Sequence, residues 1–204
     1  YTPGSQEEHF RKIAENYVRS RREFPATRAY HQYWDQRLHE LIDPKFDAQA
    51  RYLDPMCGAG LFLETPLARF DHVAACDLSE DMLTYVLPEV RERLAVCQKA
   101  DVRALPFGDA SYDVILIRGG LHHVANHLEP VVSELYRVLK PGGQLIFSEP
   151  VDTSPVVGLV RHLMYTRTRI FDAEEERGLT VEELRALMQR VGFDRFYYEP
   201  FTHA

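Results

Sequence analysis

The segment Tyr52–Gly60 combines residue types that could do chemistry, because an acid and two glycines follow directly on a short apolar run. A strand that ends at Asp54 must turn tightly here, and Gly58 and Gly60 permit backbone conformations that other residues resist. The N–H groups and the positive dipole end of a following helix could then face an anionic group. The segment therefore predicts a turn that seats a nucleotide-type cofactor.

Two more acids end separate apolar runs. Asp77 closes the run Val73–Asp77, about twenty residues after the turn, where such folds place a carboxylate on ribose hydroxyls. Asp101 follows the run Leu94–Cys97 and could accept from an adenine amine, while the backbone N–H of Val102 faces the ring. One acid at a strand end could simply cap or turn the chain. Three acids in register, each after its own predicted strand, indicate a binding edge.

The spacing separates two cofactor classes. A dinucleotide fingerprint has a third glycine where this chain has Leu63, so the pyrophosphate interpretation loses support. The segments Ala100–Ile115 and Leu139–Phe147 then complete a set of four ordered motifs. With these motifs, residues 51–149 resemble the class I S-adenosylmethionine-dependent methyltransferases, in the subgroup that includes the ubiquinone and menaquinone methyltransferases.

The resemblance implies that S-adenosylmethionine is the cofactor. It also implies that the residues that contact this cofactor lie in the turn and at the ends of the strands. The matching positions are Asp54, Met56, Cys57, Gly58, Gly60, Asp77, Leu78, Met82, Asp101, Val102, Arg118 and Gly119. One position departs from the family's pattern, because Met56 stands where glycine is usual and follows Pro55. This bulkier turn is expected to tighten or displace the methionine end of the cofactor.

His122 and His123 follow the fourth predicted strand, at the edge where cofactor and acceptor should meet, and are the catalytic candidates. Methyl transfer needs mainly alignment, so a base matters only if the acceptor loses a proton. Either histidine could take that proton near neutral pH. The pair could instead pack the turn or hold it by hydrogen bonds. Together with His127 the pair could suggest a metal, but no supporting cysteine or carboxylate spacing accompanies them, and no metal is predicted.

Strands are expected near residues 50–54, 72–76, 94–98, 112–117 and 144–148, with helices between them. This alternation predicts an α/β fold with a Rossmann-like, doubly wound, mainly parallel sheet, helices on both faces and the ligand at the carboxyl ends of the strands. The resemblance adds a closing antiparallel hairpin after the helix over 181–190. Residues 193–201 would supply only its first strand, so an incomplete hairpin and an open sheet edge are expected.

The chain divides into a helical lid over residues 1–46 and a cofactor-binding core over 47–204, with an acceptor-site insertion near 151–178. Apolar positions recur at helical spacing from Gln6 to Ile42, and Pro25 separates two helices. The aromatic residues of this section are either core positions or a cover for the cofactor: Tyr17, Tyr30, Tyr33 and Trp34. Residues 156–169 of the insertion mix apolar and basic positions, which suits an apolar acceptor with an anionic group or a solvated helix face.

Composition narrows the class of protein. The formal charge of −7 on 204 residues, without a basic stripe, argues against nucleic acid as the substrate. The chain has three cysteines, and none of them forms a Cys-x-x-Cys pair, so we expect them to be reduced residues packed in the core. Reduced cysteines indicate a reducing compartment, and the cytoplasm is the predicted location. No apolar run of membrane length occurs.

The sequence thus predicts methyl transfer from S-adenosylmethionine to a small-molecule or lipid-like acceptor in a dry pocket, with oxygen slightly favoured over carbon or nitrogen. Two alternatives stay open: a non-catalytic cofactor- or partner-binding domain of the same fold, and a nicotinamide-dependent reductase of related architecture. The residues do not determine the oligomeric state.

Overall fold

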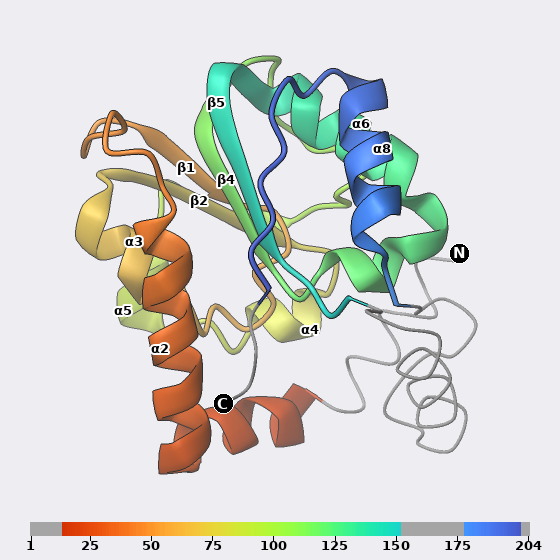
Figure 1. Cartoon of the computed structure of the whole chain (residues 1–204). Coiled ribbons are helices and arrows are strands. Elements are labelled where there is room, and N and C mark those ends of the chain that lie inside the picture. Colours follow the sequence, from red (N-terminus) through yellow and green to blue (C-terminus); the bar gives the residue numbers. More distant parts are fainter. Residues whose placement is uncertain (1–13, 152–177, 201–204) are drawn as a thin grey trace.

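A computed structural model describes residues 14–151 and 178–200 of the chain (Figure 1). A five-stranded sheet is formed by β1 Arg51–Asp54, β2 His72–Asp77, β3 Val96–Lys99, β4 Tyr112–Arg118 and β5 Leu139–Ser148. The strand order is β3-β2-β1-β4-β5, and every neighbouring pair is parallel. The order reverses between β1 and β4, and a sheet of this kind opens a crevice for ligands at that point.

Helices cover both faces of the sheet, as the alternation of elements predicts. They are α2 Pro25–Glu40, α3 Glu64–Arg69, α4 Glu80–Leu83, α5 Pro88–Arg91, α6 Leu128–Val138, α8 Val181–Val191 and the 3₁₀ helix η1 Leu121–His127. Residues 14–23 are also helical, and the break at Phe24 confirms that Pro25 starts a second helix. Figure 1 shows α6 and α8 on one side of the sheet and α2, α3 and α5 on the other. None of the described helices has both the length and the apolar character that crossing a bilayer requires.

The central strand β4 is buried on both faces, which explains its continuous apolar run. Ile115 and Ile117 point into the cluster that contains the apolar residues of α6 and α8. Val114 and Leu116 point the other way, into the cluster that contains residues of α2, α3 and α5. All four side chains are fully buried, so this strand joins two separate cores.

The fifth strand starts earlier than the sequence suggests. Tyr112 pairs with Leu139, but the next paired position, Val114, faces Gln144. The lysine, proline and two glycines between Leu139 and Gln144 therefore form an irregularity in the pairing of β5 with β4.

The strand expected over residues 193–201 is wrong for its described part, because residues 193–200 form no strand and Phe201 lies outside the described residues. The segment uses its aromatic side chains to pack against helices instead. The Phe193 ring meets Tyr136 of α6 at 5.0 Å between centroids, and Arg185 of α8 lies 5.2 Å over the Phe196 ring. The acceptor-site insertion, including residues 156–169, also lies outside the described residues.

Because β4 is buried on both faces, truncation of one of its side chains should greatly lower the free energy of unfolding. Leu116→Ala should lower the free energy of unfolding by about 3 kcal/mol or more, because the cavity forms where no neighbour can collapse. Leu94→Ala deletes the same atoms at a half-buried site and serves as the control. Equal losses for the two variants in urea denaturation would contradict this view of the core.

Candidate cofactor cleft and active site

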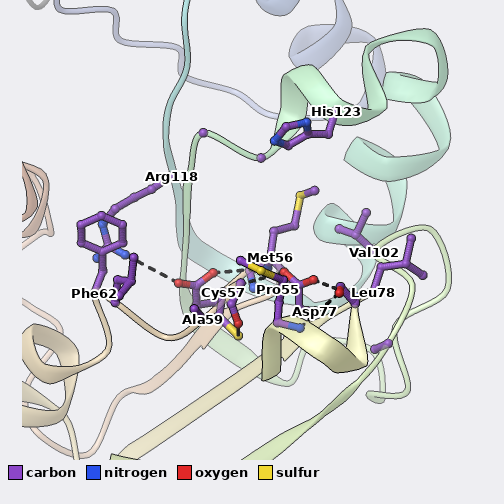
Figure 2. A pocket seen from close by; sticks show the side chains of 18 of the residues that line it. Pro55, Met56, Cys57, Ala59, Phe62, Asp77, Leu78, Val102, Arg118 and His123 are labelled. Carbon is purple, nitrogen blue, oxygen red and sulfur yellow. Dashed lines mark hydrogen bonds and ion pairs between the residues drawn. The ribbon is translucent and has the colours of Figure 1, made fainter. Parts of the chain in front are cut away.

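A cleft opens at the carboxyl ends of β1, β2 and β4, where the strand order reverses (Figure 2). Its empty space, counted out to the open mouth, is about 890 Å³. The lining residues come from five places in the chain. They are Tyr17, then Asp54–Ala59 with Leu61 and Phe62, then Asp77–Ser79 with Met82, then Ala100–Val102, and finally Arg118–Gly120 with His123 and Val124.

Every position that the sequence assigned to the cofactor lines this cleft, with the exception of Gly60. Of the two histidines, His123 lines the cleft and His122 does not. The register of the parallel strands explains the agreement, because residues at their carboxyl ends meet at one edge of the sheet.

The turn after β1 is tied to β2 by backbone and carboxylate contacts. Asp77 Oδ2 accepts a hydrogen bond of 2.7 Å from the Gly58 N–H, and Oδ1 accepts one of 2.9 Å from the Ser79 N–H. Gly58 has a φ of +53°, so the left-handed conformation that aims this N–H at Asp77 favours glycine. Burial raises the pKa of Asp77 despite these bonds. The carboxylate therefore shapes the turn while it lines the cleft.

Gly60 serves the turn rather than the cleft. Its φ is +68°, and a Cβ at this position would stand 3.0 Å from a methyl group of Val86. The next helix, α3, begins only at Glu64 and has six residues, and its first residue does not line the cleft. The helix expected to start at the turn thus begins four residues after Gly60, and a side chain brings a positive charge to the cleft.

Arg118 supplies that positive charge. Its guanidinium is buried, contacts Asp35 of α2, and lies 3.6 Å (Nη1 to Oδ2) from Asp54. The guanidinium carbon Cζ lies 4.7 Å from the centroid of the Phe62 ring. Figure 2 shows these two side chains next to each other. Burial raises the pKa of Asp54 to about 6, although the charge on Arg118 opposes this shift. Sequence reasoning had no signal for Asp35, which lies on a helix without a motif.

The carboxylate of Asp101 already accepts hydrogen bonds within the chain, which the sequence did not suggest. Its carboxylate accepts hydrogen bonds from Arg103 Nε at 3.0 and 3.1 Å and from Nη2 at 2.6 Å. These bonds hold the pKa of Asp101 below its usual value. The ion pair fixes the loop that presents Val102 to the cleft.

The histidine pair divides into two environments. Nδ1 of His122 is 2.8 Å from Glu149 Oε2, and Glu149 also accepts bonds from the N–H groups of Gly120, Leu121 and His122. His122 is therefore bound to the wall of the turn, and its ring lies 4.0 Å from that of His123. Sequence reasoning missed Glu149, although an acid directly after the fifth strand was a usable signal.

The bulk of Met56 is accommodated by the neighbouring turn. A Cβ on Gly120 would approach the Met56 sulfur to 2.7 Å, so the methionine fills space that only glycine leaves open. Figure 2 shows the Met56 side chain extending toward His123. The departure from the family's glycine is thus matched by Gly120 on the opposite wall.

The N-terminal aromatics behave differently from one another. Tyr17, on the helix over residues 14–23, lines the cleft and has the guanidinium carbon of Arg21 3.5 Å over its ring. Tyr30 and Tyr33 remain 43% and 56% exposed. Neither they nor Trp34 line the cleft.

The raised pKa of Asp54 predicts a dependence of stability on pH. A carboxyl group whose pKa is higher in the folded state stabilises the protein at low pH, and that contribution is lost as the pH rises through about 6. Asp54→Asn should therefore gain about 2 kcal/mol relative to wild type between pH 4.5 and 8. Urea denaturation at both values measures this, with Asp71→Asn in an exposed loop as the control. A constant difference between Asp54→Asn and wild type would refute it.

The chain matches the family described as "Methyltransferase domain" over residues 53–147. A demethylmenaquinone methyltransferase of Leptospira interrogans is 27% identical over 233 residues, which cover 99% of this chain and 90% of that protein. A malonyl-[acyl-carrier protein] O-methyltransferase of Erwinia billingiae is 39% identical over 98 residues, or 48% of this chain and 38% of that protein. A solved structure from Thermotoga maritima, described as a SAM-dependent methyltransferase and possible histamine N-methyltransferase, aligns with a TM-score of 0.70 at 24% identity, over 91% of this chain and 79% of that one.

The three proteins are all named as methyltransferases, whereas the acceptors in their names differ. The reductase alternative finds no support among them. The family match covers the turn, the carboxyl ends of β1, β2 and β4, and every residue of the cleft except Tyr17. The chain therefore carries a class I S-adenosylmethionine-dependent methyltransferase domain, with S-adenosylmethionine as its cofactor.

Proposed function

We propose that this domain methylates a small, lipid-like acceptor with a hydroxylated aromatic ring, such as the quinol form of the menaquinone-type compound named for the Leptospira relative. The observation that carries the proposal is the meeting of Asp77, Arg118 and His123 in one cleft with apolar walls. Asp77 and Arg118 would bind the cofactor, and His123, which lines the same cleft, would act on the acceptor.

The cleft offers a charged side chain of opposite sign for each charged group at the amino-acid end of the cofactor. None of the nitrogens of the Arg118 guanidinium has a hydrogen-bond partner of good geometry among the described residues, so the guanidinium can hold the cofactor's carboxylate. Asp54 would accept from its ammonium group, Asp77 would bind the ribose hydroxyls, and Val102 would face the adenine. S-adenosylmethionine supplies a methyl group on a sulfonium sulfur, already activated for transfer.

The remaining work is alignment and proton removal. His123 would accept the proton of an acceptor hydroxyl, which makes the oxygen and the adjoining ring carbons nucleophilic. His122 would hold its position through Glu149 and keep the turn in place. Tyr17, Met56 and Phe62 would exclude water and offer aromatic and polarisable surface to the sulfonium.

The acceptor atom stays a prediction, as do the lid role of residues 1–46 and the acceptor role of the insertion near 151–178. A hydroxylated ring serves either an oxygen or a carbon acceptor, and the position of the methyl group in the product decides between them. The free thiols of Cys57, Cys76 and Cys97 support a reducing compartment such as the cytoplasm.

Two measurements test the proposal. Calorimetric titration should show binding of S-adenosylmethionine and no binding of NADPH. Incubation with S-adenosylmethionine and a panel of quinols, acyl thioesters and amines should yield a methylated quinol by mass spectrometry. Binding without any methylated product would favour a non-catalytic domain, and a methylated amine or acyl product would overturn the acceptor class.

Removal of the Asp77 carboxylate tests the cofactor's orientation. Asp77→Ala should weaken S-adenosylmethionine by about 2–3 kcal/mol, because hydrogen bonds to a charged acceptor are lost. Asp71→Ala, in the exposed loop just before the same strand, should bind as wild type does. An unchanged dissociation constant for folded Asp77→Ala would reject the ribose site.

The two histidines should respond differently to the same substitution. His123→Asn should lower turnover roughly a hundredfold while the affinity for S-adenosylmethionine is kept. His122→Asn should mainly lower the melting temperature, since it weakens the contact with Glu149. Normal turnover of His123→Asn across the pH range would remove it as the base and leave alignment alone.

A further inference from the structure

Helix α2 carries a buried acid far from the cofactor turn in sequence. Asp35 is 4% exposed, although most of its helix faces solvent. The Thr65 hydroxyl donates to its carboxylate, and His39 Nδ1 lies 3.5 Å from Oδ1. Burial opposes ionisation, but these contacts and the charge on Arg118 hold the pKa of Asp35 below its usual value. The buried carboxylate is therefore negatively charged at neutral pH.

Arg118 lies between this carboxylate and the cofactor turn. One terminal nitrogen contacts Asp35, and the other is 3.6 Å from Asp54. The three side chains are between 4% and 9% exposed, so solvent does not screen their charges. The chain of charges runs from α2 through the end of β4 to the end of β1.

Charge, rather than well-aligned hydrogen bonds, sets the position of the guanidinium. Neither its nitrogens nor Asp35 Oδ1 have a hydrogen-bond partner of good geometry within the described residues. Phe62 covers one face of the guanidinium, and the two carboxylates attract different terminal nitrogens, Asp35 attracting Nη2 and Asp54 attracting Nη1. Without the charge of Asp35, the guanidinium would be drawn onto Asp54 and lost to a ligand.

We propose that Asp35 is a positioning residue of the cofactor site, which holds Arg118 away from Asp54 and available to the amino-acid end of S-adenosylmethionine. The inference rests on the proposed placement of that end at Arg118. Through Asp35, helix α2 would contribute to cofactor binding. Because coupling between two events is reciprocal, the bound cofactor must in turn hold α2 against the core.

Asp35→Asn tests this with little change of shape, and Glu40→Gln is the matched control on the same helix, where the acid pairs with Arg37 at the surface. At pH 7.5 the affinity of Asp35→Asn for S-adenosylmethionine should fall roughly tenfold, while Glu40→Gln should bind as wild type does. An affinity of Asp35→Asn equal to that of wild type would overturn the proposal.

The pH dependence of binding provides a readout that a purely structural role would not move. Binding should strengthen as Asp54 ionises, with a midpoint near its pKa of about 6. The charged groups that face Asp54 are Arg118 from β4, Asp77 from β2 and Asp35 from α2, and the other titratable groups beside it are Tyr52 from β1, Cys76 from β2 and Cys57 from the turn. Loss of the negative charge of Asp35 should lower this midpoint. A lower affinity with an unchanged midpoint would mean that Asp35 only fastens the helix.

Hydrogen exchange of α2 supplies the reciprocal test. S-adenosylhomocysteine should slow exchange of the amides over residues 35–40 in wild type and in Glu40→Gln, but much less in Asp35→Asn. If Asp35→Asn does not fold, Thr65→Val removes the hydroxyl that orients Asp35 and keeps every charge. That variant should bind several-fold more weakly, and wild-type binding and exchange would overturn the proposal. Failure of the wild-type chain to bind S-adenosylmethionine would instead refute the proposed function.

Discussion

The guanidinium of Arg118 lies between two buried carboxylates at the point where the order of the sheet reverses. Charges that are removed from water cost free energy, and only close counter-charges offset that cost. Asp54 and Arg118 can meet because β1 and β4 are adjacent, parallel and in register. Asp35 can join them only if α2 lies along the same face. The position of the cleft, of the turn and of the N-terminal helix thus depends on one set of contacts.

This arrangement places stability and binding in opposition. The carboxyl group of Asp54 is buried to the point where its pKa rises to about 6, so the folded protein is less stable with the group ionised. A cationic group of the cofactor would relieve that cost. Strain of this kind concentrates at functional sites, and here it lies beside a turn whose glycines already require unusual backbone angles.

The sequence predicted the parallel sheet and most of the cleft because both follow from local patterns. Each apolar run predicts a strand, and the acid at or just after its end, Asp54, Asp77 or Asp101, predicts a carboxylate at the carboxyl end of that strand. Parallel pairing then brings these ends to one edge of the sheet. Glu149 follows the fifth strand by the same logic and could have been included. Asp35 could not, because helical periodicity does not say which acid on a helix will be buried against a distant arginine.

Other differences came from competition between local and tertiary preferences. The aromatic run after Gly192 has the composition of a strand, but packing of Phe193 against Tyr136 leaves it irregular as far as residue 200. Gly60 has the spacing of a ligand-binding glycine and instead shapes the turn. The histidine pair looked equivalent in sequence, and only the contact of His122 with Glu149 distinguishes the two rings.

The most direct test is a crystal structure of this chain with S-adenosylhomocysteine bound. The ribose hydroxyls should lie on Asp77 and the carboxylate of the ligand on Arg118, with Asp35 still in contact with the guanidinium. A ligand whose carboxylate lies away from Arg118, or a guanidinium paired with Asp54 alone, would contradict the central role given to the buried charges.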